Sequence, residues 1–409
     1  MRHEGNVELM KNKKIGMAIN YDYPDYGGML QAYASFRKIR DLGYDPEAIN
    51  INALSGDIKK RKLRYFAENI FDPSIVKEKS QIVFKKILQK LNGELKTNLG
   101  KRHAAFNEFC CEKFTVSREY ESWEALNSGC HDYRAVVVGS DQLWLPSNIA
   151  GDYYTLSFVP DDVRKIAYAT SFGVSRIARG QEEKAKQFLS RIEFLSAREE
   201  SGRKIIKDHT GRDVPLVCDP ALLLSAEEWD EEALPDRIVE EPYIFCYFMG
   251  NNPWQRSFVR RLKEAPGYRI AGLLHLDQYI RDDEEYVDFA PYDVSPAGFI
   301  NLVKNAEIVC TDSFHGTVFS LIYGKRFFTF KRFSEKATLS TNTRIDTLLK
   351  KMSVQDRLVN ENDSVDEMLA REIDYQAVHA GLDAFRMDSL KYLTGALEEG
   401  DEPDDYGNR

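Results

Sequence analysis

Short apolar runs alternate with stretches of helical periodicity along the first part of the chain. Residues 15–19 form an apolar run typical of a buried strand, and a turn-rich loop with two adjacent glycines follows it. Apolar positions then recur at helical spacing over residues 30–34, and residues 44–51 have the pattern of a second strand. A strand, a loop, a helix and a strand make a βαβ unit, which predicts a parallel sheet.

Residues 55–115 interrupt this pattern. Lysine and arginine are dense there, and Ile, Leu and Phe recur at helical spacing over residues 75–91. We expect a helical insertion with a basic face. That face is either a solvated surface or a contact with an anionic substrate or a membrane surface.

Strand patterns return further along the chain in two series. An acidic stretch that contains Pro235, residues 226–241, separates the two series and is predicted to be a linker. The first series comprises residues 135–139, 165–169 and 215–219, and the second comprises residues 243–248, 269–274, 306–311 and 327–330.

The chain is therefore expected to be an α/β protein with two Rossmann-like domains that face a cleft. Residues 13–235 would form the N-terminal domain, with the helical insertion at about 55–115, and residues 240–380 the C-terminal domain. A last helix is predicted over residues 383–397, followed by a disordered acidic tail, residues 398–409. Ligands of such folds bind at the carboxyl ends of the strands, so the loops that follow strands are the places to search.

Composition narrows the class of protein. A chain of 409 residues with 43% hydrophobic residues can bury two cores. A net charge of −9 argues against nucleic acid as a partner, because phosphate backbones need a basic face. The six cysteines form no Cys-x-x-Cys pair and no zinc-ligand spacing, so no metal site is expected. No signal segment or long apolar run is visible, and we expect a cytoplasmic protein with reduced thiols.

The most informative segment for chemistry is residues 311–317 (TDSFHGT), which directly follow a predicted strand. Asp312 or Ser313 is a natural N-cap for the helix that begins there. A helix N-terminus suits a phosphate or carboxylate, and His315, next to Gly316, can donate to an anion or move a proton. The alternative is a capped helix with a hydrogen-bonded histidine.

Two further loops follow predicted strands. Gly27 and Gly28 end the first loop, just before Gln31, and let the backbone approach a ligand closely, or simply make a tight turn. Their pattern is not Gly-x-Gly-x-x-Gly, so the nicotinamide-type fingerprint is absent.

The second loop is residues 139–144 (GSDQLW). Asp141 can act as a base, Gln142 can bind hydroxyls and Trp144 can stack on a sugar. The alternative is a capped turn with a core tryptophan.

Two arginines lie at the starts of predicted helices. Arg198 and Arg344 each offer a planar fork that matches carboxylate or phosphate, and Asn342 precedes the second of them. A surface position or an ordinary ion pair is the alternative for each. Asp219, after a strand and before Pro220, is expected to be structural.

Together these segments resemble the polysaccharide pyruvyl transferase family. The resemblance runs from about residue 13 to about residue 350 and rests on the order and spacing of its motifs. The matching segments are residues 25–33 (DYGGMLQAY), 138–144 (VGSDQLW), 168–173 (YATSFG), 196–201 (SAREES), 218–223 (CDPALL), 311–317 (TDSFHGT) and 342–345 (NTRI).

The resemblance implies a glycosyltransferase-B-like fold, with a donor site in the C-terminal domain. It implies phosphoenolpyruvate as donor, no cofactor, and a saccharide or lipid-linked saccharide as acceptor in the synthesis of cell-surface polysaccharide. It also implies that His315 lies at the donor site and that Arg198 binds phosphate or carboxylate. Some members carry arginine at the position of Ser313, and Arg344 can supply that cation here.

The hypothesis for the chemistry is formation of a pyruvate ketal. His315 would be the acid or would assist the departure of phosphate, and Asp141 or Asp312 would be the base. Two other functions stay open: a nucleotide-sugar glycosyltransferase of similar fold, and a non-catalytic glycan-binding protein.

Overall fold

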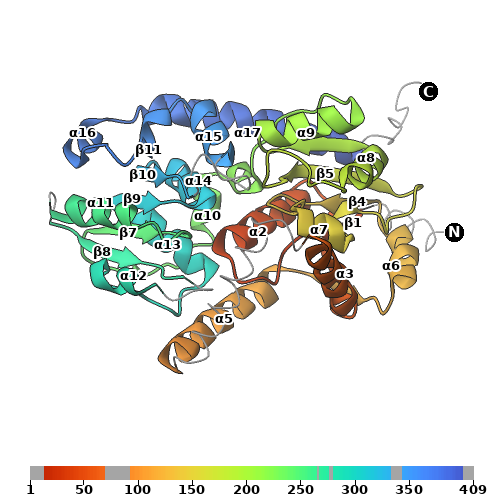
Figure 1. Ribbon diagram of the computed structural model, residues 1–409, viewed down its shortest axis with the longest axis horizontal. Coiled ribbons are helices and arrows are strands. Elements are labelled where there is room, and N and C mark those ends of the chain that lie inside the picture. Colours follow the sequence, from red (N-terminus) through yellow and green to blue (C-terminus); the bar gives the residue numbers. More distant parts are fainter. Residues whose placement is uncertain (1–12, 70–92, 265–266, 276–279, 333–342, 399–409) are drawn as a thin grey trace, which may run out of the picture.

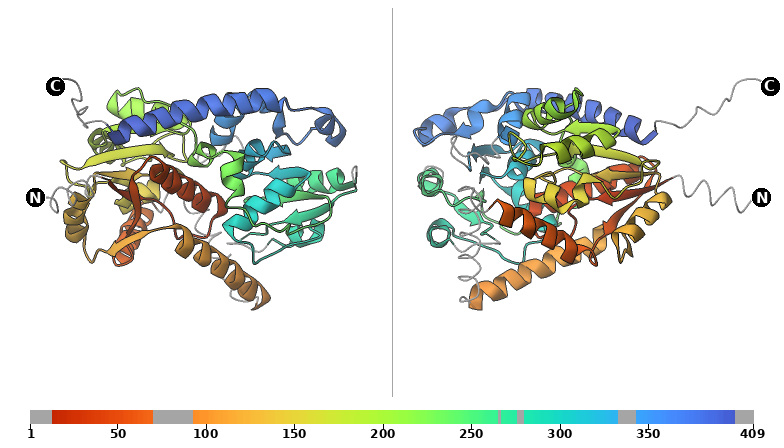
Figure 2. Two further views of the ribbon diagram at one scale, coloured as in Figure 1. Left: turned by 180° about the vertical axis from the view of Figure 1, so that it is seen from behind. Right: turned by 45° about the vertical axis from the view of Figure 1, so that its right-hand side comes forward.

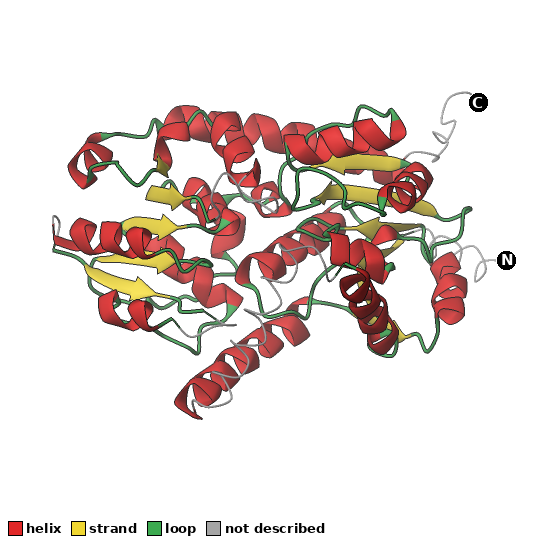
Figure 3. Cartoon of the chain, viewed as in Figure 1, coloured by secondary structure: helices red, strands yellow, loops and turns green. Residues whose placement is uncertain are grey.

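The computed structural model describes residues 13–69, 93–264, 267–275, 280–332 and 343–398 (Figure 1). Its strands form two separate parallel sheets. The six-stranded N-terminal sheet has the order β3-β2-β1-β4-β5-β6, and the five-stranded C-terminal sheet has the order β11-β10-β9-β7-β8. Figure 3 shows helices packed around the strands of both sheets. The predicted α/β class with two Rossmann-like sheets is confirmed.

The strands of both sheets are short and, except for the edge strand β3, largely buried. Those of the N-terminal sheet are β1 (Lys14–Ala18), β2 (Asp45–Asn50), β3 (Val116–Glu119), β4 (Ala135–Val138), β5 (Arg164–Thr170) and β6 (Phe194–Ala197). Those of the C-terminal sheet are β7 (Tyr243–Tyr247), β8 (Arg269–Gly272), β9 (Ile308–Thr311), β10 (Arg326–Phe330) and β11 (Leu358–Val359).

Helices connect the strands of each sheet. In the first part of the chain they are α2 (Tyr26–Asp41), α3 (Ser55–Glu68), α5 (Gly93–Lys113), α6 (Trp123–Gly129), η1 (Cys130–Asp132), α7 (Pro146–Gly151), η2 (Tyr153–Thr155), α8 (Glu182–Arg191), α9 (Glu200–Thr210), η3 (Pro220–Leu223) and α10 (Ala226–Asp230). In the second part they are α11 (Pro253–Glu264), α12 (Arg281–Tyr286), α13 (Pro296–Asn305), α14 (Phe314–Ile322), α15 (Thr343–Lys351), η4 (Gln355–Arg357), α16 (Val365–Ala370) and α17 (Tyr375–Glu398).

Several sequence predictions about single elements were wrong. Residues 215–219 form no strand, and only Leu216 bridges to Ala197. The predicted linker contains α10, whose Trp229 is fully buried, because Ser225 and Glu228 form a capping box that starts a helix there. The last helix begins at Tyr375 rather than at residue 383. The helical pattern at 75–91 and all but the first residue of the predicted tail lie outside the described residues.

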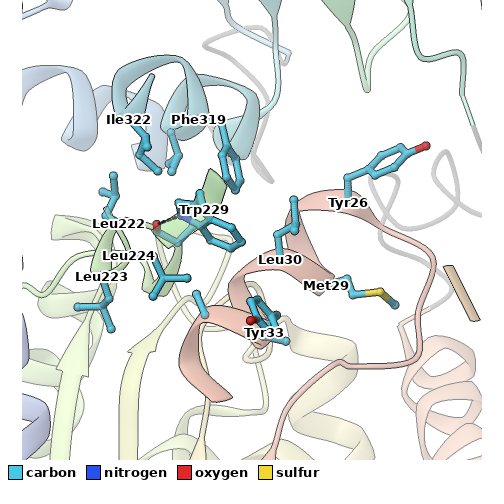
Figure 4. Close-up of a cluster of buried hydrophobic side chains, with 14 of the residues drawn as sticks. Tyr26, Met29, Leu30, Tyr33, Leu222, Leu223, Leu224, Trp229, Phe319 and Ile322 are labelled. Carbon is cyan, nitrogen blue, oxygen red and sulfur yellow. Dashed lines mark hydrogen bonds between the residues drawn. The ribbon is translucent and has the colours of Figure 1, made fainter. Parts of the chain in front are cut away.

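One apolar cluster joins the two sheets (Figure 4). Tyr26 and Tyr33 of α2 belong to it, together with Trp229 of α10 and Phe319 of α14. The indole N–H of Trp229 donates to the carbonyl of Ala221 at 2.9 Å, so its one polar atom is satisfied inside the cluster. Burial of these large rings fixes α2 against α14.

Helix α17 also ties the two sheets together, and Figure 2 shows it running along both. At its start the hydroxyl of Tyr375 donates to the carbonyl of Lys325 beside the C-terminal sheet. At its end the carbonyl of Leu397 accepts from Arg134, just before β4, and from Arg164 of β5. None of the helices in the described part of the chain combines the length and apolar character that a membrane crossing needs.

Candidate functional site

The strand orders place two sets of loops where ligands bind in such folds. In the N-terminal sheet the order reverses between β1 and β4, and in the C-terminal sheet it reverses between β7 and β9. The crevice outside the carboxyl ends of such strand pairs is the usual ligand site. The loops that follow these strands hold Asp25, Asp141 and Gly250, and His315 lies in the first turn of α14, just after β9.

The N-termini of α2 and α14 meet at this point. Asp25 caps α2 by accepting from the N–H of Gly28 at 2.5 Å, and Ser313 caps α14 by accepting from the N–H of Gly316 at 3.4 Å. A Cβ at Gly27 would lie 2.0 Å from Nδ1 of His315, so only glycine allows this approach. Two positive helix ends therefore converge on one place, which favours an anion.

His315 is held by a buried carboxylate. Its Nε2 lies 3.4 Å from Oδ2 of Asp219, and the two residues are 5% and 1% exposed. Burial alone would raise the pKa of Asp219, but His315 and Arg198 outweigh it and hold that pKa well below its usual range. Asp219, which the sequence suggested was structural, therefore fixes a residue of the predicted site.

Arg198 and Arg344 flank the ring of Phe314. Their guanidinium carbons lie 4.6 and 5.6 Å from its centroid. Nη2 of Arg198 and Nη1 of Arg344 lie 3.6 and 3.7 Å from the same oxygen of Asp141. Burial, and then the charge of Arg198, lower the pKa of Arg344 to about 10. The structure thus brings His315, Arg198 and Arg344 together, as the sequence predicted.

Buried nitrogens without hydrogen-bond partners gather in this place. Among the described residues they include Nε and Nη2 of Arg198 and Nε of Arg344. A buried donor without an acceptor costs about 1–3 kcal/mol, and native proteins tolerate few of them. Several such donors around one point indicate a binding site for an anionic or hydroxyl-rich ligand.

The two predicted bases differ in access. Both oxygens of Asp312 accept from backbone N–H groups, of Met249 at 2.6 Å and Gly250 at 2.9 Å, and the residue is 1% exposed. Asp312 therefore holds the loop after β7, and this placement does not fit the predicted role of a base. The side chain of Asp141 is 22% exposed, and its backbone has the strained φ of +76°.

Some predicted ligand residues are turned away from the site. Trp144 is fully buried against Phe172 and Phe188, and its N–H donates to the carbonyl of Tyr154, which is incompatible with stacking on a sugar. Gln31 is also fully buried, and its Nε2 donates to the carbonyl of Gly28.

The remaining predicted residues have other placements. Gly316 packs against β9, since a Cβ there would lie 2.4 Å from Oγ1 of Thr311. Gly28 lies between two carboxylates: a Cβ there would be 3.0 Å from Asp25 and 3.7 Å from Asp141. Asn342 lies outside the described residues.

Sequence analysis missed the roles of three charged residues. Burial and the neighbouring Asp141 raise the pKa of Asp25. Burial raises the pKa of Glu199, which accepts from the hydroxyl of Ser171 at 2.8 Å. Arg332 has its Nε 3.9 Å from Oδ1 of Asp312 and stabilises the charged form of Asp25. Arg332 is the second residue after β10, so the rule that ligands lie at strand ends would have found it.

Comparison with known proteins identifies a family for most of the chain. The model of the family named polysaccharide pyruvyl transferase matches residues 25–332. This range includes every charged residue described above except Arg344. No curated protein matches the chain.

Several solved structures align with most of this chain at low sequence identity. A UDP-GlcNAc 2-epimerase from Neisseria meningitidis is 11% identical with a TM-score of 0.45, and the match covers 93% of this chain and 99% of that chain. A UDP-GlcNAc 2-epimerase from Methanocaldococcus jannaschii is 12% identical with a TM-score of 0.47, covering 90% and 92%. MurG from Acinetobacter baumannii is 6% identical with a TM-score of 0.40, covering 95% and 99%. At these identities and TM-scores the matches do not indicate a function for this chain.

Proposed function

This chain belongs to the polysaccharide pyruvyl transferase family, and from that premise we propose that it transfers pyruvate from phosphoenolpyruvate to two hydroxyls of a saccharide, forming a ketal. The acceptor is a free or lipid-linked saccharide of cell-surface polysaccharide synthesis. The observation that carries the proposal is the convergence of Arg198, Arg344 and His315 with buried donors that have no acceptor. Phosphoenolpyruvate carries a phosphate and a carboxylate, and such a set of donors matches both.

The reaction needs one proton donor and one proton acceptor. Protonation of the methylene carbon of phosphoenolpyruvate makes the adjacent carbon electron-poor, and the first sugar hydroxyl attacks it and loses its proton. The bond from that carbon to the phosphate oxygen then breaks. The second hydroxyl attacks the same carbon, and its proton leaves with inorganic phosphate. One hydroxyl proton thus replaces the proton that was added to form the methyl group, and the other leaves on inorganic phosphate.

The residues divide these tasks by their positions. Arg198, Arg344 and the N-terminus of α14 hold the donor's anionic groups. His315, held by Asp219, donates the proton or assists the departure of phosphate. Asp141 is the more accessible carboxylate of the two predicted bases, and it accepts the proton of the attacking hydroxyl.

The exposed face of α3 bears on whether the protein contacts a membrane, where a lipid-linked acceptor would lie. Lys59, Lys60 and Arg64 are exposed on one side of this helix together with Leu63, which is 62% exposed. Such a face suits an anionic membrane surface as well as water, so both interpretations of the basic insertion stay open. Sedimentation with anionic vesicles separates them, because a merely solvated face leaves the protein in the supernatant.

The test is release of inorganic phosphate from phosphoenolpyruvate, measured against a panel of saccharide acceptors. We expect release only when an acceptor is present, and the His315→Ala variant should lose at least about a hundredfold in turnover. The control is donor binding: phosphoenolpyruvate should raise the melting temperature, and nucleotide sugars should not. A shift with a nucleotide sugar, or saccharide binding without phosphate release, would instead support one of the two alternatives.

A further inference from the structure

Exposed aromatic rings are rare in the described part of this chain. Most of its Tyr, Phe and Trp side chains lie in the apolar clusters. Among the described residues, the large apolar side chains with high exposure include two aromatic ones, Tyr23 at 57% and Phe289 at 38%. An exposed ring costs solvation without contributing to the core, so its location is informative.

Tyr23 lies in the loop that leads from β1 into the site. Its carbonyl accepts from the N–H of Asp25 at 2.8 Å, which fixes the turn just before α2. Two residues after Asp25 comes Gly27, against which the ring of His315 packs. Tyr23 is therefore joined to the site by a short, hydrogen-bonded turn.

The same loop borders the predicted base. A Cβ at Gly28 would lie 3.0 Å from Oδ1 of Asp25 and 3.7 Å from Oδ2 of Asp141, so the loop that runs from Asp22 to Asp25 ends beside Asp141. Asp22 is exposed, and Asp141 is partly exposed. An aromatic ring and two carboxylates consequently share one edge of the site.

This edge is where an acceptor would have to lie. The donor's anionic groups belong with Arg198 and Arg344, both of which are less than 8% exposed. A saccharide has to approach from the exposed side, with one hydroxyl next to Asp141. A sugar ring has an apolar C–H face and a polar rim, so it is matched by an aromatic face beside hydrogen-bond acceptors.

We propose that Tyr23 is the platform on which a sugar ring of the acceptor stacks, while Asp22 and Asp141 accept hydrogen bonds from its hydroxyls. This assignment rests on the proposed function for the nature of the ligand, and it names the residue that receives the saccharide. Tyr23 takes the role that the sequence suggested for Trp144, which is buried.

The test compares Tyr23→Ala with Tyr23→Phe, Tyr23→Trp and Phe289→Ala. We expect Tyr23→Ala to raise the KM for the saccharide about fivefold to tenfold while the KM for phosphoenolpyruvate and its thermal shift stay unchanged. The Phe and Trp variants keep a ring and should behave like the wild type. Phe289→Ala removes an exposed ring beside the outer strand β8 and should change neither constant. An unchanged saccharide KM in Tyr23→Ala, or an equal rise in Phe289→Ala, would overturn the proposal.

Direct binding separates this inference from the proposed function. Calorimetry with methyl glycosides of common hexoses and N-acetylhexosamines needs neither phosphoenolpyruvate nor turnover. If no phosphate is released with any acceptor, the pyruvyl transfer fails, but weaker glycoside binding by Tyr23→Ala than by wild type would still support the platform. Equal binding by both proteins, or no binding by the wild type, counts against it.

Discussion

The two sides of the site differ in charge. The side built on the C-terminal sheet is rich in cations: His315, Arg332 and Arg344, with a carboxylate, Asp312, that is occupied by backbone N–H groups. The side built on the N-terminal sheet is rich in carboxylates: Asp25, Asp141, Glu199 and Asp219, with one arginine, Arg198. In a chain of net charge −9, an anion can therefore be held on one side while a proton acceptor is kept on the other.

The charge difference explains how one site could accommodate both substrates of the proposed ketal formation. An anionic donor would be repelled by the carboxylates unless cations lay closer to it, and a hydroxyl is activated only near an ionised carboxylate. Arg198 lies on the boundary, because its Nη1 donates to Asp219 at 2.5 Å while its guanidinium carbon lies 4.6 Å from the ring centroid of Phe314 in α14. The charge pattern suggests that donor and acceptor enter opposite sides of the same space.

The largest expected effects come from one substitution on each side. Asp141→Asn removes the proposed base and should lower kcat by at least about a hundredfold while phosphoenolpyruvate still raises the melting temperature.

Arg344→Gln removes a donor-binding cation and should raise the KM for phosphoenolpyruvate about tenfold to a hundredfold, with little change in the KM for the saccharide. Steady-state phosphate release with either substrate varied measures both constants.

Each variant has a matched control in the chain. Asp152 shares the left-handed backbone of Asp141 and pairs with Arg61, but it lies outside the site, so Asp152→Asn should leave turnover unchanged. Arg344→Lys keeps the positive charge and should retain part of the donor affinity. If Asp141→Asn weakened donor binding as much as Arg344→Gln does, the two sides would not be separate.

Much of the fold was predictable because its signals are local. Apolar runs and helical spacing indicated β1, β4, β5 and most of the C-terminal strands, and the polar segments after them contained His315 and Asp141. The strand order was not predictable, since it depends on contacts between segments far apart in the chain. The meeting of α2 with α14 likewise arises from the shared core around Trp229.

The errors in the site have the same origin. The sequence could not indicate whether Trp144 points to the core or to a ligand, because that depends on Phe172 and Phe188 from later segments. Asp312 was predicted as a helix cap or a base, but Ser313 caps α14 and the N–H groups of Met249 and Gly250 occupy Asp312. Burial and hydrogen-bond satisfaction are properties of the tertiary structure, so sequence patterns reach them only indirectly.

A single methyl group can disrupt the contact between Gly27 of α2 and His315 of α14. In Gly27→Ala the new Cβ would lie 2.0 Å from Nδ1 of His315, so the imidazole ring or α2 must move. We expect a loss of about 1–3 kcal/mol in the free energy of unfolding and about a tenfold loss in turnover, because His315 is displaced. Gly56→Ala, in the first turn of α3 with nothing within 4 Å, is the control and should cost neither. Full activity in Gly27→Ala would show that the fit of His315 against α2 is unimportant.

The smallest expected effect concerns the charge of Asp25 itself. Burial and Asp141 raise the pKa of Asp25 above its ordinary value of 3.8, so the folded protein binds this proton more tightly than the unfolded chain does. The stability that the bound proton contributes is complete below pH 3.8 and is lost as the pH rises through the raised pKa. Asn at this position keeps an N-cap oxygen for Gly28 but has no charge.

Asp25→Asn should therefore melt about 1–2 °C above the wild type at pH 8, and the difference should shrink toward zero as the pH approaches 4. Thermal denaturation followed by circular dichroism across this pH range measures it. A wild type that is the more stable protein at pH 8 would mean that the carboxylate of Asp25 is stabilised by the cations of the opposite side. The two sides would then differ less in charge than the arrangement of Asp25 and Asp141 implies, because cations of the C-terminal side would neutralise the carboxylate of Asp25.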